Sequence, residues 1–525
     1  MASLCFVLMV SVTFVYTAAS IIVRPSMYSD GGWGFLGWES GQRASAGFNY
    51  SMLPDLADIS KDAAGFGTVW SPGQNVFPEL LASSGLSLGL SIALVTAAFS
   101  ALGLVGWYLL YRAFGFPLRT AMIALAIVAS NRFFNTPFLI YNGGEVLLFG
   151  VAPYFALMVW KLRSLRWSAV TPMLVGTFVL FFAKLSGIIF AAATIGAAAT
   201  CGAEAWRDRD TLRKMVVAVV TVGLVGVTFY FAWYSRGWTP VHPTSQLNWA
   251  RLPMDVAYAI SASCCATLSL PDMASYILMY PGRAVLKSIE PGFLVFLPIA
   301  VGVFAVTWSR LRGDYDEYLR FVSLIAVASI AVLLVTWVRG SVVGHEERHL
   351  RLVALLFLAG IVHAFVEFPG KALRTTFALV VVGASLYGLA SFAIRVGVIS
   401  HGPLGDRGFR HMIASPEVLD FMRKIDVAGP DRAPPLVLVP TPEMALDFAR
   451  ARVMANQADF DSPDELRARI YRGRVARLYV IMQNKLVANG KADIILRSFA
   501  DYAIDAWQTI PLGDFVCFYQ ELPAK

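Results

Sequence analysis

Long apolar stretches separated by short polar segments make up most of the first 400 residues. The longer ones could cross the roughly 30 Å hydrocarbon core of a bilayer as single helices of about 20 residues. The pattern predicts eleven spans, at about 3–23, 87–110, 120–139, 145–160, 167–183, 185–202, 215–234, 291–308, 320–338, 350–366 and 375–397. It therefore predicts a mainly α, polytopic membrane helix bundle.

Composition agrees with this class. The 525-residue chain is 57% hydrophobic and 15% charged, whereas a soluble domain carries charge on about a quarter of its residues. Its net charge of +8 is spread over short clusters between the apolar stretches, without the basic stripe that nucleic-acid binding requires. The five cysteines have no metal-ligand spacing, and their odd number argues against a complete disulfide framework.

The segment around Lys184 decides the orientation. Residues 167–183 and 185–202 form either one long helix or two short spans that turn at Lys184. With two spans, the basic clusters between spans all fall on one face, which the positive-inside rule makes cytoplasmic. We therefore predict a hairpin at Lys184, a cytoplasmic amino terminus and an extracytoplasmic carboxyl terminus.

Three large segments then lie on the outer face: loops at about 24–86 and 235–290, and the tail from residue 400. The tail is polar, and "SPEVLDFMRKI", "TPEMALDFARAR" and "SPDELRARIY" each open with a helix-start signal. Between them, "PLVLVP" and "RLYVIM" are typical of buried strands. We predict a membrane domain at 1–399 and a small extracytoplasmic α/β domain at 400–525.

Three carboxylates near the outer face are candidate catalytic groups. Asp30 and Glu39 lie in the glycine- and tryptophan-rich "SDGGWGFLGWES", whose turn-rich, aromatic surface could shield a carboxylate and raise its basicity. Glu145 follows a Gly-Gly turn at the start of the fourth span. The competing interpretations are a solvated loop for the first two and an acid that complements a helix dipole for Glu145.

Basic residues near the same face are candidate ligands for an anionic headgroup. Lys184 either extends to the interface or supplies a fixed positive charge, and Arg132 lies before the fourth span. In "HEERHLRL", Arg348 and Arg351 share a side of a helix at i,i+3, next to His349. A guanidinium group can donate two parallel hydrogen bonds to a phosphate.

The same segment contains the pattern H-E-x-x-H, formed by His345, Glu346 and His349. On a helix, this pattern binds zinc in metalloproteases. No third ligand is evident in the sequence, so a membrane zinc protease is the weaker alternative and no metal site is predicted.

Together these features resemble the GT-C superfamily, and most closely bacterial relatives of dolichyl-phosphate-mannose protein mannosyltransferases and lipid A aminoarabinose transferases. The shared features are an acid after the first span, a second acid at the third–fourth connection, a late helix with a basic tip and an extracytoplasmic tail. The segment "ERHLRL" is similar to the E-R-Y-L-x-P element of these families. Three departures stand out: Asp30 is single where an adjacent acidic pair is usual, His349 replaces a common tyrosine, and the proline is missing.

The resemblance implies an enzyme of the inner (plasma) membrane that moves a sugar from a polyprenyl-phosphate donor to an extracytoplasmic acceptor. One of the three carboxylates would serve as base, and cations such as Lys184 and Arg348 would stabilise the leaving phosphate. The resemblance implies no specific cofactor, and the use of a divalent cation is an open alternative. The alternative from another class is a transporter or flippase of lipid-linked saccharides. Many transporters contain internal repeats, and the sequence shows none. The sugar, the lipid length and the acceptor are not specified.

Overall fold

The computed structural model describes residues 1–68, 70–201, 209–237, 247–270, 273, 290–340, 344–426, 433–456, 458–459 and 461–521. Its contacts group the chain into two compact units. The helical unit comprises Met1–Ala19, Leu94–Phe138 and Gly143–Arg395. The mixed unit comprises Ser20–Ala93, Leu139–Asn142 and Val396–Lys525.

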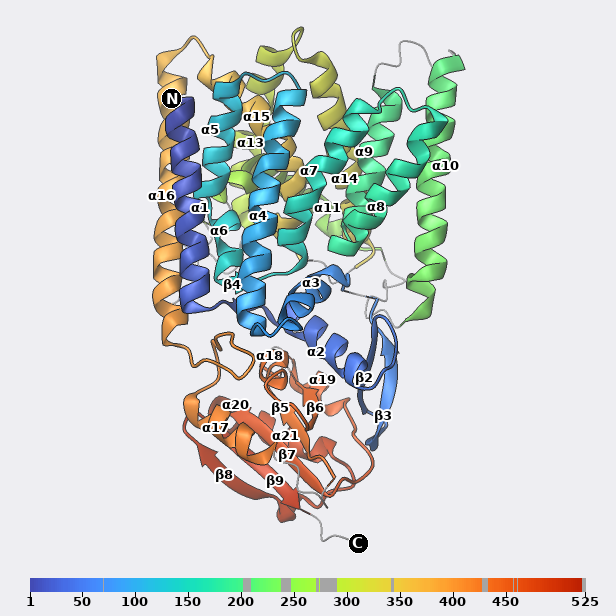
Figure 1. The fold of residues 1–525 in the computed structure, drawn as a ribbon, viewed down its shortest axis with the longest axis vertical. Coiled ribbons are helices and arrows are strands. Elements are labelled where there is room, and N and C mark those ends of the chain that lie inside the picture. Colours follow the sequence, from blue (N-terminus) through green and yellow to red (C-terminus); the bar gives the residue numbers. More distant parts are fainter. Residues whose placement is uncertain are drawn as a thin grey trace. The chain divides into compact units, whose positions relative to one another are not determined.

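Each of the eleven predicted stretches contains an apolar helix, and these helices run side by side (Figure 1). Among the described residues, six are long and apolar enough to cross a membrane: α1 (Ala2–Val23), α4 (Leu88–Ala113), α7 (Gly144–Lys161), α10 (Arg209–Ala232), α14 (Asp316–Val338) and α16 (Lys371–His401). Five are shorter: α5 (Leu118–Ser130), α8 (Val170–Ala183), α9 (Gly187–Thr200), α13 (Glu290–Leu311) and α15 (Arg351–Val366). The chain is thus a multi-pass membrane protein, and the number of spans stays a prediction.

Aromatic side chains form contacts between helices of the helical unit. Tyr16 of α1 packs against Phe392 of α16, with ring centroids 4.4 Å apart.

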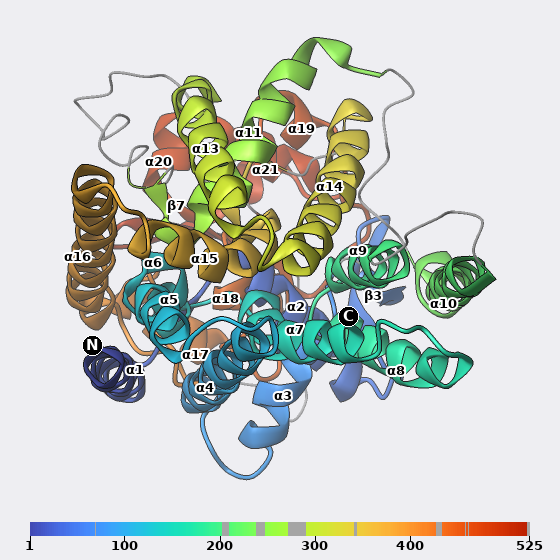
Figure 2. The ribbon, with the colours of Figure 1, turned by 90° about the horizontal axis from the view of Figure 1, so that it is seen from above.

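Helix α10 lies at the edge of the bundle, where it contacts α8 and α9 (Figure 2). The break between α8 and α9 falls at Lys184, the C-cap of α8, which confirms the predicted hairpin.

A further helix, α11 (Leu252–Cys265), lies within the segment predicted as the second outer loop. It packs against α13, α14 and α15 (Figure 2). Its small and polar residues, such as those of "AISASCC", give it no long apolar run, which is why the hydropathy pattern missed it. The rest of that predicted loop lies largely outside the described residues.

The tail folds around a five-stranded sheet in the order β6-β5-β7-β9-β8 (Figure 1). The predicted strands at "PLVLVP" and "RLYVIM" are confirmed as β5 (Leu436–Val439) and β7 (Arg477–Gln483). The pattern did not predict β6 (Arg452–Ala455), β8 (Gln508–Leu512) or β9 (Phe515–Glu521). Strands β5, β6 and β7 are parallel, and β9 runs antiparallel to β7 and β8.

Alternate residues of these strands face two apolar cores, as the two-residue repeat of a strand requires. One core contains Val437 and Val439 together with residues of α17 (Pro416–Ile425) and α18 (Pro442–Ala445). The other contains Leu436 and Leu438 with residues of α19 (Pro463–Arg467), α20 (Asn484–Ala488) and α21 (Lys491–Ser498). The predicted helix starts at Ser415 and Ser462 are confirmed, since each serine side chain accepts a hydrogen bond from a first-turn amide.

Residues of the first predicted outer loop share a core with the tail. The stretch predicted to be turn-rich is instead helix α2 (Ser29–Arg43), whose Phe35 and Leu36 join the core of α17 and α18. It is followed by the hairpin of β2 (Tyr50–Asp55) and β3 (Asp58–Phe66), and by α3 (Gly73–Ala82). Strand β1 (Ser26–Met27) pairs in parallel with β4 (Ile140–Tyr141).

Helix α2 is rich in glycine because its neighbours approach its backbone closely. A Cβ atom on Gly41 would lie 1.6 Å from the carbonyl oxygen of Tyr50 in β2, which no side chain could tolerate. Glycine weakens an isolated helix by about 1 kcal/mol per residue, so tertiary packing imposes a helix that local preference does not favour.

Candidate active site

A polar pocket lies within the helical unit, where the start of α7, the α8–α9 turn and the start of α15 meet. Its cavity volume is about 60 Å³. Its polar lining consists of Glu145, Ser186, Ser329, Arg348, His349 and Arg351, and apolar residues of α7, α9, α14 and α15 complete the wall. Three of the predicted phosphate ligands therefore line one pocket together with a predicted carboxylate.

The close approach of α7 to the end of α8 depends on Gly144. A Cβ atom there would lie 3.0 Å from Cγ of Lys184 and 3.1 Å from the carbonyl oxygen of Ala183. This proximity brings Glu145, in the first turn of α7, into an ion pair with Lys184. The Glu145 side chain is only 8% exposed. Burying its negative charge would be costly without the positively charged Lys184 as a partner.

The guanidinium groups of the two arginines in the pocket have different neighbours. Arg348 pairs with exposed Glu346, with Nε 2.7 Å from Oε2 and Nη2 3.0 Å from Oε1. The Arg351 guanidinium lies 4.9 Å from the centre of the Phe133 ring. Among the described residues, Nε of Arg351 and Nε2 of His349 are buried without a hydrogen-bond partner. Buried polar atoms without partners are costly, so the pocket is suited to a ligand that would satisfy them.

Arg132 is not brought to this pocket. Its Nη1 donates a hydrogen bond of 2.8 Å to the hydroxyl oxygen of Tyr387 on α16, and its guanidinium lies over that ring. A role for Arg132 in phosphate binding stays a prediction that this placement does not support.

The geometry of the H-E-x-x-H segment differs from that of a zinc protease. Only Glu347–His349 are helical, as a single 3-10 turn, so His345 and His349 are not placed one α-helical turn apart. Nε2 of His345 lies 2.8 Å from Oδ1 of buried Asp255 in α11. The part of the chain that the structure describes contains no group of three or more histidine, cysteine or acidic side chains that could hold a metal ion.

The two candidate carboxylates of α2 belong to the mixed unit and point in opposite directions. Nine residues at about 100° each place Asp30 and Glu39 on opposite sides of the helix. Asp30 lies in the first helical turn and is exposed. Glu39 is largely buried, 2.6 Å from Nη2 of Arg407, which also donates a 3.0 Å hydrogen bond to Glu79 of α3.

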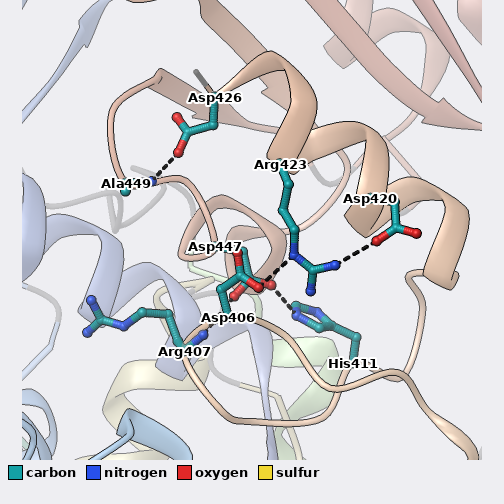
Figure 3. A network of polar contacts seen from close by, with 8 residues as sticks. All are labelled: Asp406, Arg407, His411, Asp420, Arg423, Asp426, Asp447 and Ala449. Atoms are coloured by element: carbon teal, nitrogen blue, oxygen red, sulfur yellow. Dashed lines mark hydrogen bonds and ion pairs between the residues drawn. The ribbon is translucent and has the colours of Figure 1, made fainter. Parts of the chain in front are cut away.

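A polar network holds the loop that carries Arg407 (Figure 3). The backbone amide of Arg407 donates to Oδ1 of Asp447 at 3.2 Å, and Oδ2 of the same aspartate lies 2.6 Å from Nε2 of buried His411. Arg423 of α17 binds Asp406 at 2.7 Å. Arg407 is thereby fixed within the mixed unit as the partner of both Glu39 and Glu79.

Sequence reasoning missed Arg407, Glu79 and Asp255. No local motif marks them, and Arg407 lies 368 residues after Glu39 in the chain. Only the folded mixed unit shows that Glu39 contacts Arg407, whereas Asp30 is exposed on the same helix.

Burial raises the pKa of Glu39 to about 8; nearby Arg407 acts in the opposite direction, and the Glu79 carboxylate adds to the increase. One arginine thus faces two carboxylates, those of Glu39 and Glu79. The pKa of Glu39 is higher in the folded protein than the ordinary value of 4.5. Its contribution to stability is therefore fully present below pH 4.5 and is lost as the pH rises to about 8.

We expect the Glu39→Gln variant to remove this pH dependence. The free energy of unfolding of the wild type should fall, relative to that of the variant, as the pH rises from 5 to 8, because the unfolded chain releases a proton that folded Glu39 retains. Thermal unfolding in detergent at several pH values measures the difference. Parallel stability curves for the two proteins would show that Glu39 is ionised in the folded state.

Comparison with known proteins adds information at the level of the fold. No protein-family model matches the chain, and no curated protein matches its sequence. Among solved structures, the chain is similar to ArnT from Cupriavidus metallidurans bound to undecaprenyl phosphate, with 14% identity, a TM-score of 0.52, and coverage of 98% of this chain and 97% of that one.

It is also similar to the arabinofuranosyltransferase AftD from Mycobacteria, again with 14% identity and a TM-score of 0.52. That match covers 95% of this chain and 37% of AftD. Both proteins are GT-C glycosyltransferases. The chain has the GT-C fold. The predicted fold class, a membrane helix bundle with a small C-terminal α/β part, is confirmed.

Proposed function

We propose that this GT-C-fold protein is a glycosyltransferase that moves a sugar from a polyprenyl-phosphate donor to an acceptor outside the cytoplasm. The observation that carries the proposal is the pocket of the helical unit. There, Arg348 and Arg351 line the pocket with buried Glu145, which pairs with Lys184, and two buried nitrogens lack partners among the described residues. The presence of undecaprenyl phosphate in the ArnT structure supports a lipid phosphate as the ligand.

In this proposal the pocket binds the phosphate of the donor. Arg351 and His349 offer unpartnered nitrogens, and Arg348 can exchange its exposed partner Glu346 for a phosphate. A guanidinium group binds phosphate oxygens in a bidentate manner. As the bond between the sugar and the phosphate breaks, these cations stabilise the negative charge that develops on the leaving phosphate.

Asp30 is the proposed general base. The acceptor hydroxyl oxygen attacks the anomeric carbon, its proton passes to the Asp30 carboxylate, and the phosphate departs with the electron pair of the broken bond. Asp30 is exposed in the first turn of α2, where an acceptor can reach it.

Glu145 has a positioning role in this proposal. Its ion pair holds Lys184 at the α8–α9 turn and neutralises part of the positive charge of Lys184 and the nearby arginines while no donor is bound. The charged residues stand at helix ends, in the first turn of α7, at the C-cap of α8 and at the start of α15. A transporter usually places its ligand site at broken helices near the membrane midplane, so this arrangement favours the enzyme over the flippase.

The proposal is tested with purified protein in vesicles, a panel of radiolabelled polyprenyl-phosphate sugars, and envelope extract as the acceptor source. We expect label from one or more donors to pass to a non-lipid or second lipid product. Movement of intact donor across the bilayer without any transfer would instead identify a flippase.

A further inference from the structure

A second pocket, here called the arginine groove, lies entirely within the mixed unit. It has a cavity volume of about 240 Å³ and lies between the end of α2, the β2–β3 hairpin and residues 449–453. Arg43, Arg450 and Arg452 line it, together with Asp62 and mostly small or apolar residues such as Leu36 and Met52.

Arg43 ends α2 and faces the groove with donors to spare. Its Nη1 donates to the carbonyl oxygens of Phe448 and Ala449 at 3.2 and 3.0 Å. In the described part of the chain, its Nε and Nη2 have no hydrogen-bond acceptor. The guanidinium is therefore fixed in place by one nitrogen while the others stay open to the groove.

Arg450 is held by its backbone and leaves its side chain accessible. The carboxylate of Asp426 accepts hydrogen bonds from the amides of Ala449, Arg450 and Ala451, at 2.8, 3.1 and 2.7 Å. Figure 3 shows the first of these contacts. The Arg450 side chain is exposed and has no partner among the described residues. A rigid loop thus presents a free guanidinium group beside that of Arg43.

Arg452 is neutralised within the groove. Its Nη2 lies 2.7 Å from Oδ1 of Asp62 and its Nε lies 2.9 Å from the same oxygen. With three arginines and one aspartate, the lining has a net charge of +2. A phosphate monoester carries about −1.5 to −2 at neutral pH, so its charge matches that of the groove better than the single charge of a carboxylate does.

We infer that the arginine groove binds a phosphate group on the acceptor glycan. The assignment of this phosphate to the acceptor rests on the proposed function. Arg43 and Asp30 stand at opposite ends of α2, thirteen residues apart. At about 1.5 Å per residue this is about 20 Å. The acceptor therefore carries its phosphate about 20 Å from the hydroxyl that receives the sugar.

Binding is tested on the full-length protein in detergent at low salt, by calorimetric titration with glucose 6-phosphate. We expect Arg450→Gln to weaken binding about tenfold, because a hydrogen-bonded charge pair is lost. Asp62→Asn should strengthen binding several-fold, because it releases Arg452 from its counter-ion. The control Arg467→Gln removes the same charge from an exposed helix of the same unit, outside the groove, and should leave binding unchanged.

Equal affinity in the wild type, Arg450→Gln and Asp62→Asn would overturn the assignment. Equal affinity for glucuronate, which carries one negative charge, would also overturn it. Competition by phosphatidic-acid vesicles that depends on Arg450 would overturn it as well, because it would identify a lipid headgroup as the ligand. The variants are expected to fold, because Asp426 holds the loop through backbone amides and not through the Arg450 side chain.

The two proposals fail separately. Asp30→Asn should bind glucose 6-phosphate as the wild type does, even if the chain transfers no sugar at all. In the transfer assay, Arg450→Gln should raise KM for a long phosphorylated acceptor while kcat and the KM of a short neutral acceptor stay the same. Unchanged KM values in an active enzyme would remove the groove from acceptor binding and leave the transferase intact.

Discussion

The Asp30→Asn variant is expected to lose sugar transfer by about 10²–10⁴-fold, the usual contribution of a general base. An amide of nearly the same shape cannot accept the proton of the attacking hydroxyl. Because Asp30 is exposed on the first turn of α2, the substitution should change stability little. Initial rates of transfer from a labelled donor measure the effect.

Two controls separate this effect from a loss of charge in general. Asp464→Asn alters a fully solvated aspartate of the same unit and should retain full activity. Donor binding by the Asp30→Asn variant should also be retained, because the proposed phosphate ligands lie in the helical unit. Wild-type turnover by Asp30→Asn would remove this carboxylate from the mechanism, and a loss shown only by Glu39→Gln would transfer the role to Glu39.

The second large effect is expected at Lys184. Lys184→Met should destabilise the protein by roughly 3–5 kcal/mol, because it leaves the buried carboxylate of Glu145 without its partner. The same variant should lose affinity for the lipid-phosphate donor. Both changes are measured on purified protein, by thermal unfolding and by titration with polyprenyl phosphate.

The double variant Lys184→Met/Glu145→Gln distinguishes a structural ion pair from a donor ligand. With the carboxylate removed, most of the lost stability should return, since no charge is left buried and unpaired. Donor affinity should not return. Recovery of both properties in the double variant would show that Lys184 serves only to neutralise Glu145.

The parts of the fold that could be predicted from the sequence were those with a strong local signal. The apolar stretches gave the helices, and the charge distribution together with Lys184 gave the α8–α9 hairpin. Ser415 and Ser462 marked helix starts in the tail. Helix α2 could not be predicted because five glycines oppose a helix locally and only packing against β2 and the tail imposes it.

The candidate site was predictable in part for the same reason. Arg348 and Arg351 were found because they are close in sequence, and Glu145 and Lys184 because ionisable groups at apolar spans are rare. The engagement of Glu39 by Arg407, and of His345 by Asp255, depends on contacts between distant segments that leave no local pattern. Those contacts give the candidate base Glu39 an arginine partner and the candidate zinc ligand His345 an aspartate partner.

The most direct measurement is an experimental structure of the full-length protein with a polyprenyl-phosphate sugar analogue. We predict that the phosphate contacts Lys184, Arg348 and Arg351, and that the Asp30 carboxylate lies about 6 Å from the anomeric carbon, which leaves room for one acceptor oxygen between them. A phosphate bound away from these cations, or an Asp30 carboxylate tens of ångströms from the sugar, would contradict the proposed transferase.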